Sequence, residues 1–419
     1  MKLDPSAVKV LIAIFSNSEY LSRLIVGKPM LLQNLLEPRK AYGAGTCVVF
    51  ARELSDALSR ASSIPGKIDA LRRFKHQEEI RIGMADLLSN MDLMSVSRDL
   101  SKLAEVCLDA SLRLALYEIG KRFGIPGPWP GLAVIGVGKL GGRELTYGSD
   151  LDILFVCSES RVTRPLAGLT AIENFSKVAE KTIAYLSTIT REGYVFRVDT
   201  RLRPTGSKGP LVQSIDAFKN YFTKQAETWE RQALLRARHV AGDREVGAEF
   251  CDTIQELIYR DVDKTVLAED IRTMRKRMEG EIGKGNATHY NIKQGAGGLV
   301  DIEFIVQYMQ LLHGKRHRWL RMPGTYNVLR ALWKHKLLEQ GDFRVLTRAY
   351  LFIRQLESRM RIVTDQEIND LSRDPQTLRF LARRMGYNDD DGTAGQKLLS
   401  DYEYLSTRVR SLFEKIVHG

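Results

Sequence analysis

The sequence predicts an α+β protein in which a strand-containing core lies between two helical regions. Three observations predict this class. Hydrophobic residues recur at helical spacing in the N-terminal third, the period becomes that of strands after a glycine- and proline-rich run at 124–131, and helical spacing returns after about residue 216. Because 419 residues exceed one ordinary hydrophobic core, we expect a helical region over 1–125, a catalytic core over 131–245 and a helical bundle over 246–419.

Composition narrows the class of protein. Hydrophobic residues make up 44% and charged residues 27% of the chain, and neither a signal peptide nor a run of roughly 18 apolar residues is present. We therefore expect a cytoplasmic protein with no membrane contact. The four cysteines are far apart, so neither a zinc site nor a disulfide framework is indicated.

The formal net charge of +12 favours an anionic partner, whether a nucleotide, a nucleic acid or an acidic protein surface. Charge alone does not choose among the three. Because the sequence lacks a basic motif interleaved with aromatic residues, we do not expect nucleic-acid binding.

The N-terminal region is expected to end in a long helix. Leu100, Leu103, Cys107 and Ala115 repeat at helical spacing until the Gly/Pro run stops the pattern. That run is the first predicted domain boundary.

The core begins with the apolar run 132–135, which predicts a strand. A glycine-studded loop is expected to follow over 136–142. A strand that leads into such a loop is typical of phosphate binding, although a tight turn is the alternative.

The next strand carries two carboxylates. Alternation over 148–156 places Asp150 and Asp152 on one face, while Leu151, Ile153 and Phe155 face the other way. The two carboxylates then stand about 7 Å apart. Such like charges are relieved by water, a cationic side chain, a raised pKa or a metal ion, and Mg²⁺ suits the pair when a nucleotide is present. The alternative is a solvated strand end.

A further strand is predicted over 194–203. Its polar side carries Arg197, Asp199, Arg201 and Arg203. If this strand lies beside the Asp-x-Asp strand, three carboxylates converge on metal and arginines stand ready for phosphate oxygens. An exposed strand face is the alternative.

The C-terminal half is expected to be helical. Leu346, Tyr350, Ile353, Leu356 and Met360 mark one face of a long amphipathic helix.

Two other groups of residues carry weaker signals. Gly297 and Gly298 are expected to form a turn into a helix whose positive end is stabilised by Asp301 or Glu303. Arg231, with Arg236 and Arg238 at helical spacing after it, is expected either to pack and form ion pairs or to act directly.

Taken together, a strand, a Gly-Gly loop, an Asp-x-Asp strand and a later strand with a third aspartate occur in the order that a nucleotidyltransferase core requires. The chemistry fits as well, because phosphoryl-type transfer depends on positioning and charge neutralisation. We therefore predict a metal-dependent nucleotidyltransferase with Asp150, Asp152 and Asp199 as catalytic and metal-binding residues.

Four long motifs also carry a resemblance to a known family. They are GVGKLGGRELTYGSDLDILFV (136–156), FRVDTRLRPTGSKGPLV (196–212), TWERQALLRARHVAGD (228–243) and IKQGAGGLVDIEFIVQY (292–308). With these motifs the chain resembles the bacterial glutamine synthetase adenylyltransferase family. The resemblance implies a DNA polymerase β-like nucleotidyltransferase core flanked by helical domains, which transfers AMP from ATP to a tyrosine of glutamine synthetase and so regulates nitrogen assimilation.

The resemblance also implies roles for individual residues. Asp150 and Asp152 would be shared by two Mg²⁺ ions, and Asp199 would complete the site of the ion that activates the hydroxyl and could accept the tyrosine proton. The remaining residues implied in nucleotide binding are Gly141, Gly142, Gly148, Ser149, Lys139, Arg201 and Arg203. For the two arginines a strand-holding ion pair is the alternative, and for Lys139 a cap of the loop.

Complete members of this family contain two such units in tandem, one attaching AMP and one removing it by phosphorolysis. This chain shows one Asp-x-Asp core, so we expect a single half, more similar to the C-terminal, adenylylating unit. The alternatives are the removing half and a non-catalytic, partner-binding half. The resemblance further implies the signal protein PII as an input to the complete enzyme.

Overall fold

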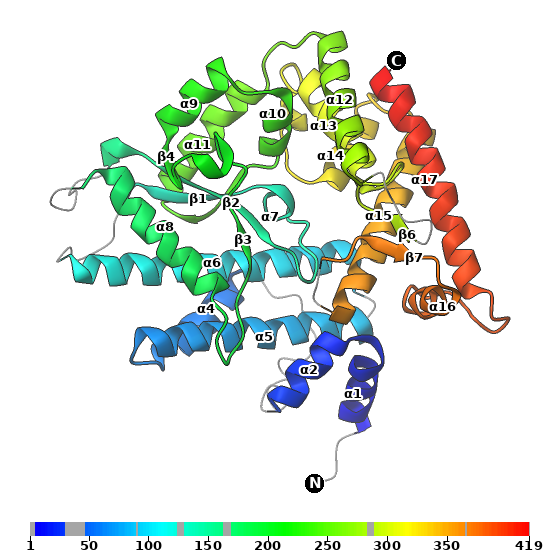
Figure 1. Cartoon of the computed structure of the whole chain (residues 1–419), viewed down its shortest axis with the longest axis horizontal. Helices are drawn as coiled ribbons and strands as arrows, with labels where there is room; N and C mark the ends of the chain where they lie inside the picture. Colours follow the sequence, from blue (N-terminus) through cyan, green and yellow to red (C-terminus); the bar gives the residue numbers. More distant parts are fainter. Residues whose placement is uncertain are drawn as a thin grey trace.

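The computed structural model describes residues 5–29, 47–88, 91–123, 130–161, 169–282, 289–364 and 367–418 (Figure 1). Most of the Gly/Pro run that predicts the first domain boundary, residues 124–129, lies outside this part of the chain. The division at 125, 131 and 245 therefore stays a prediction.

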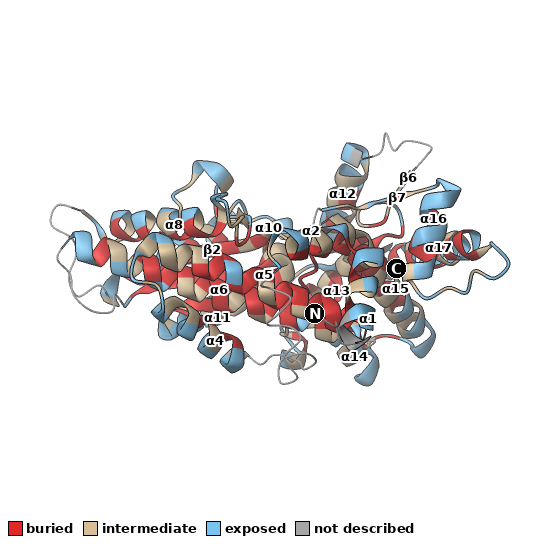
Figure 2. Ribbon diagram, turned by 90° about the horizontal axis from the view of Figure 1, so that it is seen from below, coloured by how far each residue is buried: buried red, intermediate tan, exposed pale blue. Residues whose placement is uncertain are grey.

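The N-terminal region is helical, as predicted. Its helices are α1 (Pro5–Asn17), α2 (Glu19–Gly27), α4 (Cys47–Ser59), α5 (Ile64–Leu88) and α6 (Leu93–Arg122). Asp92 caps α6, because its side chain accepts a hydrogen bond from the backbone N–H of Ser95 at 3.1 Å. Buried residues run along the inner faces of α5 and α6, as Figure 2 shows.

A five-stranded mixed sheet forms the centre of the chain. Its strands are β1 (Leu132–Gly136), β2 (Leu151–Cys157), β3 (Val198–Asp199), β4 (Val212–Ser214) and β5 (Arg238–Gly242). Strand β1 pairs with β2 and with β5 in antiparallel fashion, while β3 and β4 both pair in parallel with β2. Helix α7 (Gly138–Gly142) joins β1 to β2, and α8 (Ala171–Ser187) precedes β3.

The two faces of the sheet pack against different helices. Leu151, Ile153 and Phe155 belong to a hydrophobic cluster with the N-terminal helices and α8. Leu154 and Val156 belong to a second cluster that includes α9 (Ile215–Lys224) and α11 (Arg244–Ile258). Successive side chains of β2 therefore point to opposite faces of the sheet, and Asp152 lies on the same face as Leu154.

The remainder of the chain is mostly helical, as predicted. It contains α10 (Thr228–Leu234), α12 (Lys264–Ile282), α13 (Leu299–His313), α14 (Thr325–Lys334), α15 (Gln340–Thr364), α16 (Pro375–Arg384) and α17 (Ala394–His418). A small antiparallel pair, β6 (His289–Asn291) and β7 (Asp370–Ser372), lies among them. Short 3₁₀ turns occupy Glu159–Arg161, Gly206–Lys208 and Arg318–Leu320.

Helix α15 connects the two helical regions. It packs against α13, α14 and α17, and also contacts α2 and α6 (Figure 1). Leu346, Tyr350, Ile353 and Leu356 are buried on it, which confirms the predicted amphipathic face. The α+β class with flanking helices is therefore confirmed, while the DNA polymerase β-like type of the core stays a prediction.

Three predictions of local secondary structure were wrong. The expected loop over 136–142 contains the short helix α7, and the expected strand over 194–203 shrinks to the two residues of β3. The strand ends because the Asp199 carboxylate accepts a hydrogen bond from the backbone N–H of Arg201 at 2.8 Å, which starts a turn. Arg238 is not helical but opens β5.

Three of the four cysteines have described side chains. Cys107 and Cys157 are buried, Cys251 is half-buried, and all three are free thiols. The side chain of Cys47 lies outside the described residues. Across the described helices, none combines the length and apolar character needed to cross a membrane.

Candidate active site

A cavity of about 270 Å³ opens where the sheet meets the C-terminal helices. Its lining joins residues from β2, β3 and α7 with residues from α13, α15 and the neighbouring loops. The lining residues are Gly138, Lys139, Ser149, Asp150, Asp152, Asp199, Arg201, Arg236, Lys293, Leu299, Glu303, Arg361 and Glu367. We call this the sheet cavity.

One wall of the sheet cavity is acidic and comes from two adjacent strands. Asp150 immediately precedes β2, Asp152 lies in β2, and Asp152 pairs in register with Asp199 of β3. The condition set by the sequence analysis, that these two strands lie side by side, is therefore met. The backbone thus sets two aspartates directly opposite each other, an arrangement that is unfavourable for like charges. We call Asp150, Asp152 and Asp199 the acidic wall.

The pKa values of Asp150 and Asp152 are both raised. Burial raises the pKa of Asp152 to about 6, and the negative charges of Asp199 and Asp150 act in the same direction. Burial also raises the pKa of Asp150, although Arg197 opposes that shift. Strongly shifted groups that line one cavity are typical of functional sites.

Asp199 differs because it has a partner. Arg201 donates from Nε to its Oδ2 at 2.9 Å and from Nη2 to the same oxygen at 2.5 Å, and this hydrogen bonding lowers the pKa of Asp199. The Arg201 side chain is 79% exposed, so solvent weakens the pair. Within the described ranges, no group of three or more His, Cys, Asp or Glu side chains is arranged to hold a metal ion.

Glycine is required at the start of α7. Gly138 has a φ of +52°, and a Cβ atom at this position would collide with the Asp152 carboxylate. The backbone N–H of Val137 also donates to the carbonyl oxygen of Asp152 at 2.9 Å. Helix α7 is therefore fixed against the acidic wall. Gly141, Gly142 and Gly148 do not belong to the cavity lining, and their phosphate contacts stay a prediction.

Four cations also line the sheet cavity, and each of them has a carboxylate partner. Lys139 Nζ lies 2.5 Å from Glu357, Arg236 lies 2.9 Å from Glu303, and Lys293 lies 2.9 Å from Glu367. Arg361 lies 2.9 Å from Glu357. We call Lys139, Arg236, Lys293 and Arg361 the basic wall.

Burial governs the electrostatics of this wall. Burial lowers the pKa of Lys139 to about 8, although the charge of Glu357 opposes the shift. Burial alone would raise the pKa of Glu367, but Lys293 and Arg361 lower it to about 2. The basic wall is thus a network of ion pairs rather than a set of free cations.

Two predicted nucleotide-binding residues have clear structural roles. Arg203 donates to the carbonyl oxygens of Thr200 at 2.7 Å and Gly209 at 3.3 Å, so it holds the turn after β3. Ser149 Oγ accepts from the backbone N–H of Thr146 at 3.1 Å and lines the cavity. Their contacts to phosphate stay predictions.

The prediction missed part of the basic wall. Lys293 and Glu303 lie within one of the long motifs, but the local pattern around Lys293 carries no phosphate signal, and Glu303 was expected to stabilise a helix end. Arg361 reaches the cavity through the packing of α15, and Glu367 comes after that helix in the chain. No spacing rule in the sequence connects these residues to Asp150.

Comparisons with known proteins now place the chain. The glutamate-ammonia ligase adenylyltransferase family matches residues 8–253, and the PII-uridylyltransferase family matches residues 267–417. Both names describe the transfer of nucleotidyl groups, so the class is that of the nucleotidyltransferases. The first match covers more than half of the 419-residue chain. The chain therefore belongs to the glutamate-ammonia ligase adenylyltransferase family.

Individual relatives agree with this assignment. Proteins named bifunctional glutamine synthetase adenylyltransferase/adenylyl-removing enzyme are 38% identical in Methylococcus capsulatus over 83% of this chain, and 34% identical in Thioalkalivibrio sulfidiphilus over 91%. The relative in Nitrosococcus oceani is 36% identical over 86%. The matched regions make up 38%, 41% and 39% of those relatives, so the chain spans about two fifths of their length.

Proposed function

We propose that this chain transfers AMP from ATP to a tyrosine hydroxyl of glutamine synthetase with the help of Mg²⁺. The observation that carries the proposal is the sheet cavity, which is lined by three aspartates, two of them paired on adjacent strands, and by the cations of the basic wall. An acidic wall suits metal ions and a basic wall suits phosphate oxygens, and ATP transfer requires both.

The acidic wall fits Mg²⁺ chemically. Its donors are all carboxylate oxygens, which Mg²⁺ prefers. Burial raises the pKa of Asp152, and no cation lies within ion-pairing distance of its carboxylate among the described residues. A bound cation would therefore offset the free-energy cost of burying this negative charge. When bound, Mg²⁺ would polarise the phosphate oxygens and lower the pKa of the attacking hydroxyl.

The reaction forms one bond and breaks one. The tyrosine oxygen bonds to the α-phosphorus of ATP, the bond from that phosphorus to the β-phosphate oxygen breaks, and pyrophosphate leaves. The lowered pKa of Asp199 makes this carboxylate a poor proton acceptor. We therefore assign it to cation binding and the tyrosine proton to water.

The basic wall is assigned to the phosphates. Lys293 and Arg236 line the same cavity as Asp152, and each can exchange part of its glutamate contact for a phosphate oxygen. Lys139 lies beside Gly138 at the start of α7 and completes the same wall.

The direction of transfer and the regulatory inputs belong to the same proposal. We assign the adenylylating direction, with PII acting through the longer protein. The reverse reaction is the second candidate because the printed name of each relative includes an adenylyl-removing activity. In that case orthophosphate attacks the AMP-tyrosine bond and ADP is released.

The test follows label from ATP to glutamine synthetase. The purified chain is incubated with unmodified synthetase, Mg²⁺ and ATP labelled at the α-phosphate, beside an Asp150→Asn/Asp152→Asn variant. Metal-dependent labelling that the variant lacks supports the proposal. Release of ADP from adenylylated synthetase and orthophosphate, without forward labelling, assigns the removing reaction. If the folded protein gives neither labelling of the synthetase nor release of ADP, catalysis by this chain is contradicted.

A further inference from the structure

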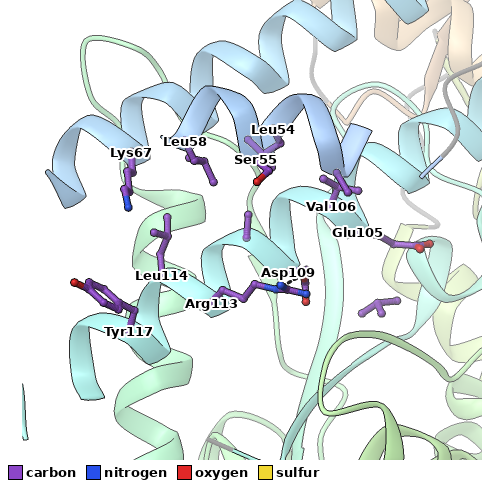
Figure 3. Close-up of a pocket in the computed structure, with 13 residues that line it drawn as sticks. Leu54, Ser55, Leu58, Lys67, Glu105, Val106, Asp109, Arg113, Leu114 and Tyr117 are labelled. Atoms are coloured by element: carbon purple, nitrogen blue, oxygen red, sulfur yellow. Dashed lines mark hydrogen bonds and ion pairs between the residues drawn. The ribbon is translucent and has the colours of Figure 1, made fainter. Parts of the chain in front are cut away.

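A second cavity lies on the other side of the sheet from the acidic wall. It has a volume of about 490 Å³ and lies between α4, α6 and β5, as Figure 3 shows. Its walls are mainly apolar and include Leu54, Leu58, Val106, Leu114 and Val240. The volume is in the range of small-molecule sites. We call it the α4–α6 cavity.

The charged groups of the α4–α6 cavity do not balance at its two ends. Glu105 forms an ion pair with Arg238 at 2.5 Å, and Asp109 forms one with Arg113 at 2.7 Å. Lys67 forms no ion pair with any residue that the structure describes. Figure 3 places Lys67 and Tyr117 toward one end of the cavity and Glu105 at the other. That end therefore offers an ammonium group with no ion-pair partner among the described residues.

We propose that the α4–α6 cavity binds a small amphipathic carboxylate. The apolar body of the ligand would cover the leucine and valine walls, where burial of apolar surface stabilises the bound state. Its carboxylate would meet the Lys67 ammonium group, because a charge-assisted hydrogen bond in an apolar cavity is stronger than a neutral one. A cationic ligand would find no unpaired carboxylate among these lining residues, because Glu105 and Asp109 each form an ion pair.

This cavity is distinct from the site proposed for ATP. The two cavities share no lining residue. A nucleoside triphosphate carries several negative charges, whereas the α4–α6 cavity offers one unmatched cation and lacks an acidic wall for a metal ion. Its chemistry therefore suits one anionic group on an apolar body.

The probe for a first experiment is decanoate, with 1-decanol as its uncharged counterpart. Titration calorimetry on the full chain should show one saturable site for decanoate. Lys67→Gln should weaken decanoate binding about tenfold and leave 1-decanol binding unchanged, because only the carboxylate meets the ammonium group. Lys121→Gln is the matched control, since Lys121 is an exposed lysine of α6 outside the cavity, and should change neither affinity.

Two blocking variants locate the site. Ala110→Phe places a ring in the cavity from α6, and Ser55→Trp does so from an exposed position on α4, where folding is easily preserved. Either folded variant should lose decanoate binding. The proposal is overturned by the absence of saturable binding to the parent chain, by binding that survives both blocking variants, or by equal effects of Lys67→Gln on decanoate and decanol.

Discussion

The acidic and basic walls of the sheet cavity differ in how their charges are compensated. Each cation of the basic wall has a glutamate within 2.9 Å. Asp150 and Asp152 have no such partner among the described residues, and Asp199 has only the exposed Arg201. Packing alone would favour pairing the acids as well. The charges of the basic wall are thus compensated within the protein, whereas those of Asp150 and Asp152 are not paired among the described residues.

The largest effect is expected when the negative charge of Asp152 on the acidic wall is removed. We expect Asp152→Asn to lower AMP transfer at saturating ATP and Mg²⁺ by at least about 10³-fold, because metal-dependent charge stabilisation is worth several kcal/mol. Asp252→Asn, at an exposed position of α11, is the control and should retain full activity. A folded Asp152→Asn chain with activity within tenfold of the parent would contradict the assignment.

Neutralising Glu357, the carboxylate at the centre of the ion-pair network of the basic wall, should lower stability instead. Glu357 binds Lys139, Arg354 and Arg361, all within 2.9 Å, and is buried. Glu357→Gln leaves buried cations uncompensated, so we expect the free energy of unfolding in urea to fall by about 3 kcal/mol. Glu414→Gln, which breaks an exposed pair with Arg410, should cost less than about 1 kcal/mol. Equal losses would show that burial does not distinguish the two pairs.

The same Asp152→Asn change should stabilise the chain when no metal is present. The folded-state pKa of Asp152, about 6, exceeds the ordinary value of 3.8, so the folded state loses stability as pH rises between these values. We therefore expect an increase of about 1–2 kcal/mol in the free energy of unfolding above pH 6 in EDTA, and no increase near pH 4. Urea titrations at both pH values measure it. A variant that is less stable at neutral pH would refute the idea of an uncompensated charge.

The smallest effect is expected from one member of the basic wall. Lys293→Met removes one of several cations that face the phosphates, so we expect the KM for ATP to rise about tenfold with less change in kcat. Initial rates over a range of ATP concentrations separate the two constants. Lys276→Met, at an exposed position of α12, provides the comparison. An unchanged KM would remove Lys293 from the proposed phosphate site.

The acidic wall was predictable because its signal is local. Alternation of Asp150 and Asp152 with apolar residues predicts their strand face, and alternation around Asp199 predicts a second strand, while the pairing of the two strands is seen only in the structure. The α+β class follows from the same change of period. The length of β3 was not predictable from alternation, because the side chain of Asp199 ends the strand by capturing the backbone of Arg201.

The basic wall was not predictable for a different reason. Lys293 and Arg361 reach the cavity from elements 141 and 209 residues beyond Asp152. Strand β5 was missed for a related reason, because its pairing with β1 joins residues about 100 positions apart. Such contacts depend on tertiary packing, and a short window of sequence carries no information about them.

Strand β5 lines the α4–α6 cavity and is hydrogen-bonded to α7, which lines the sheet cavity. Val240 lines the α4–α6 cavity at an irregularity in the pairing of β5 with β1, while Arg238 of the same strand donates to the carbonyl oxygens of Leu140 at 3.0 Å and Gly141 at 3.2 Å in α7. Two occupants that bear on one strand are linked reciprocally: the factor by which one changes the affinity of the other is the same in both directions. A titration of either cavity with the other one filled therefore measures the coupling for both.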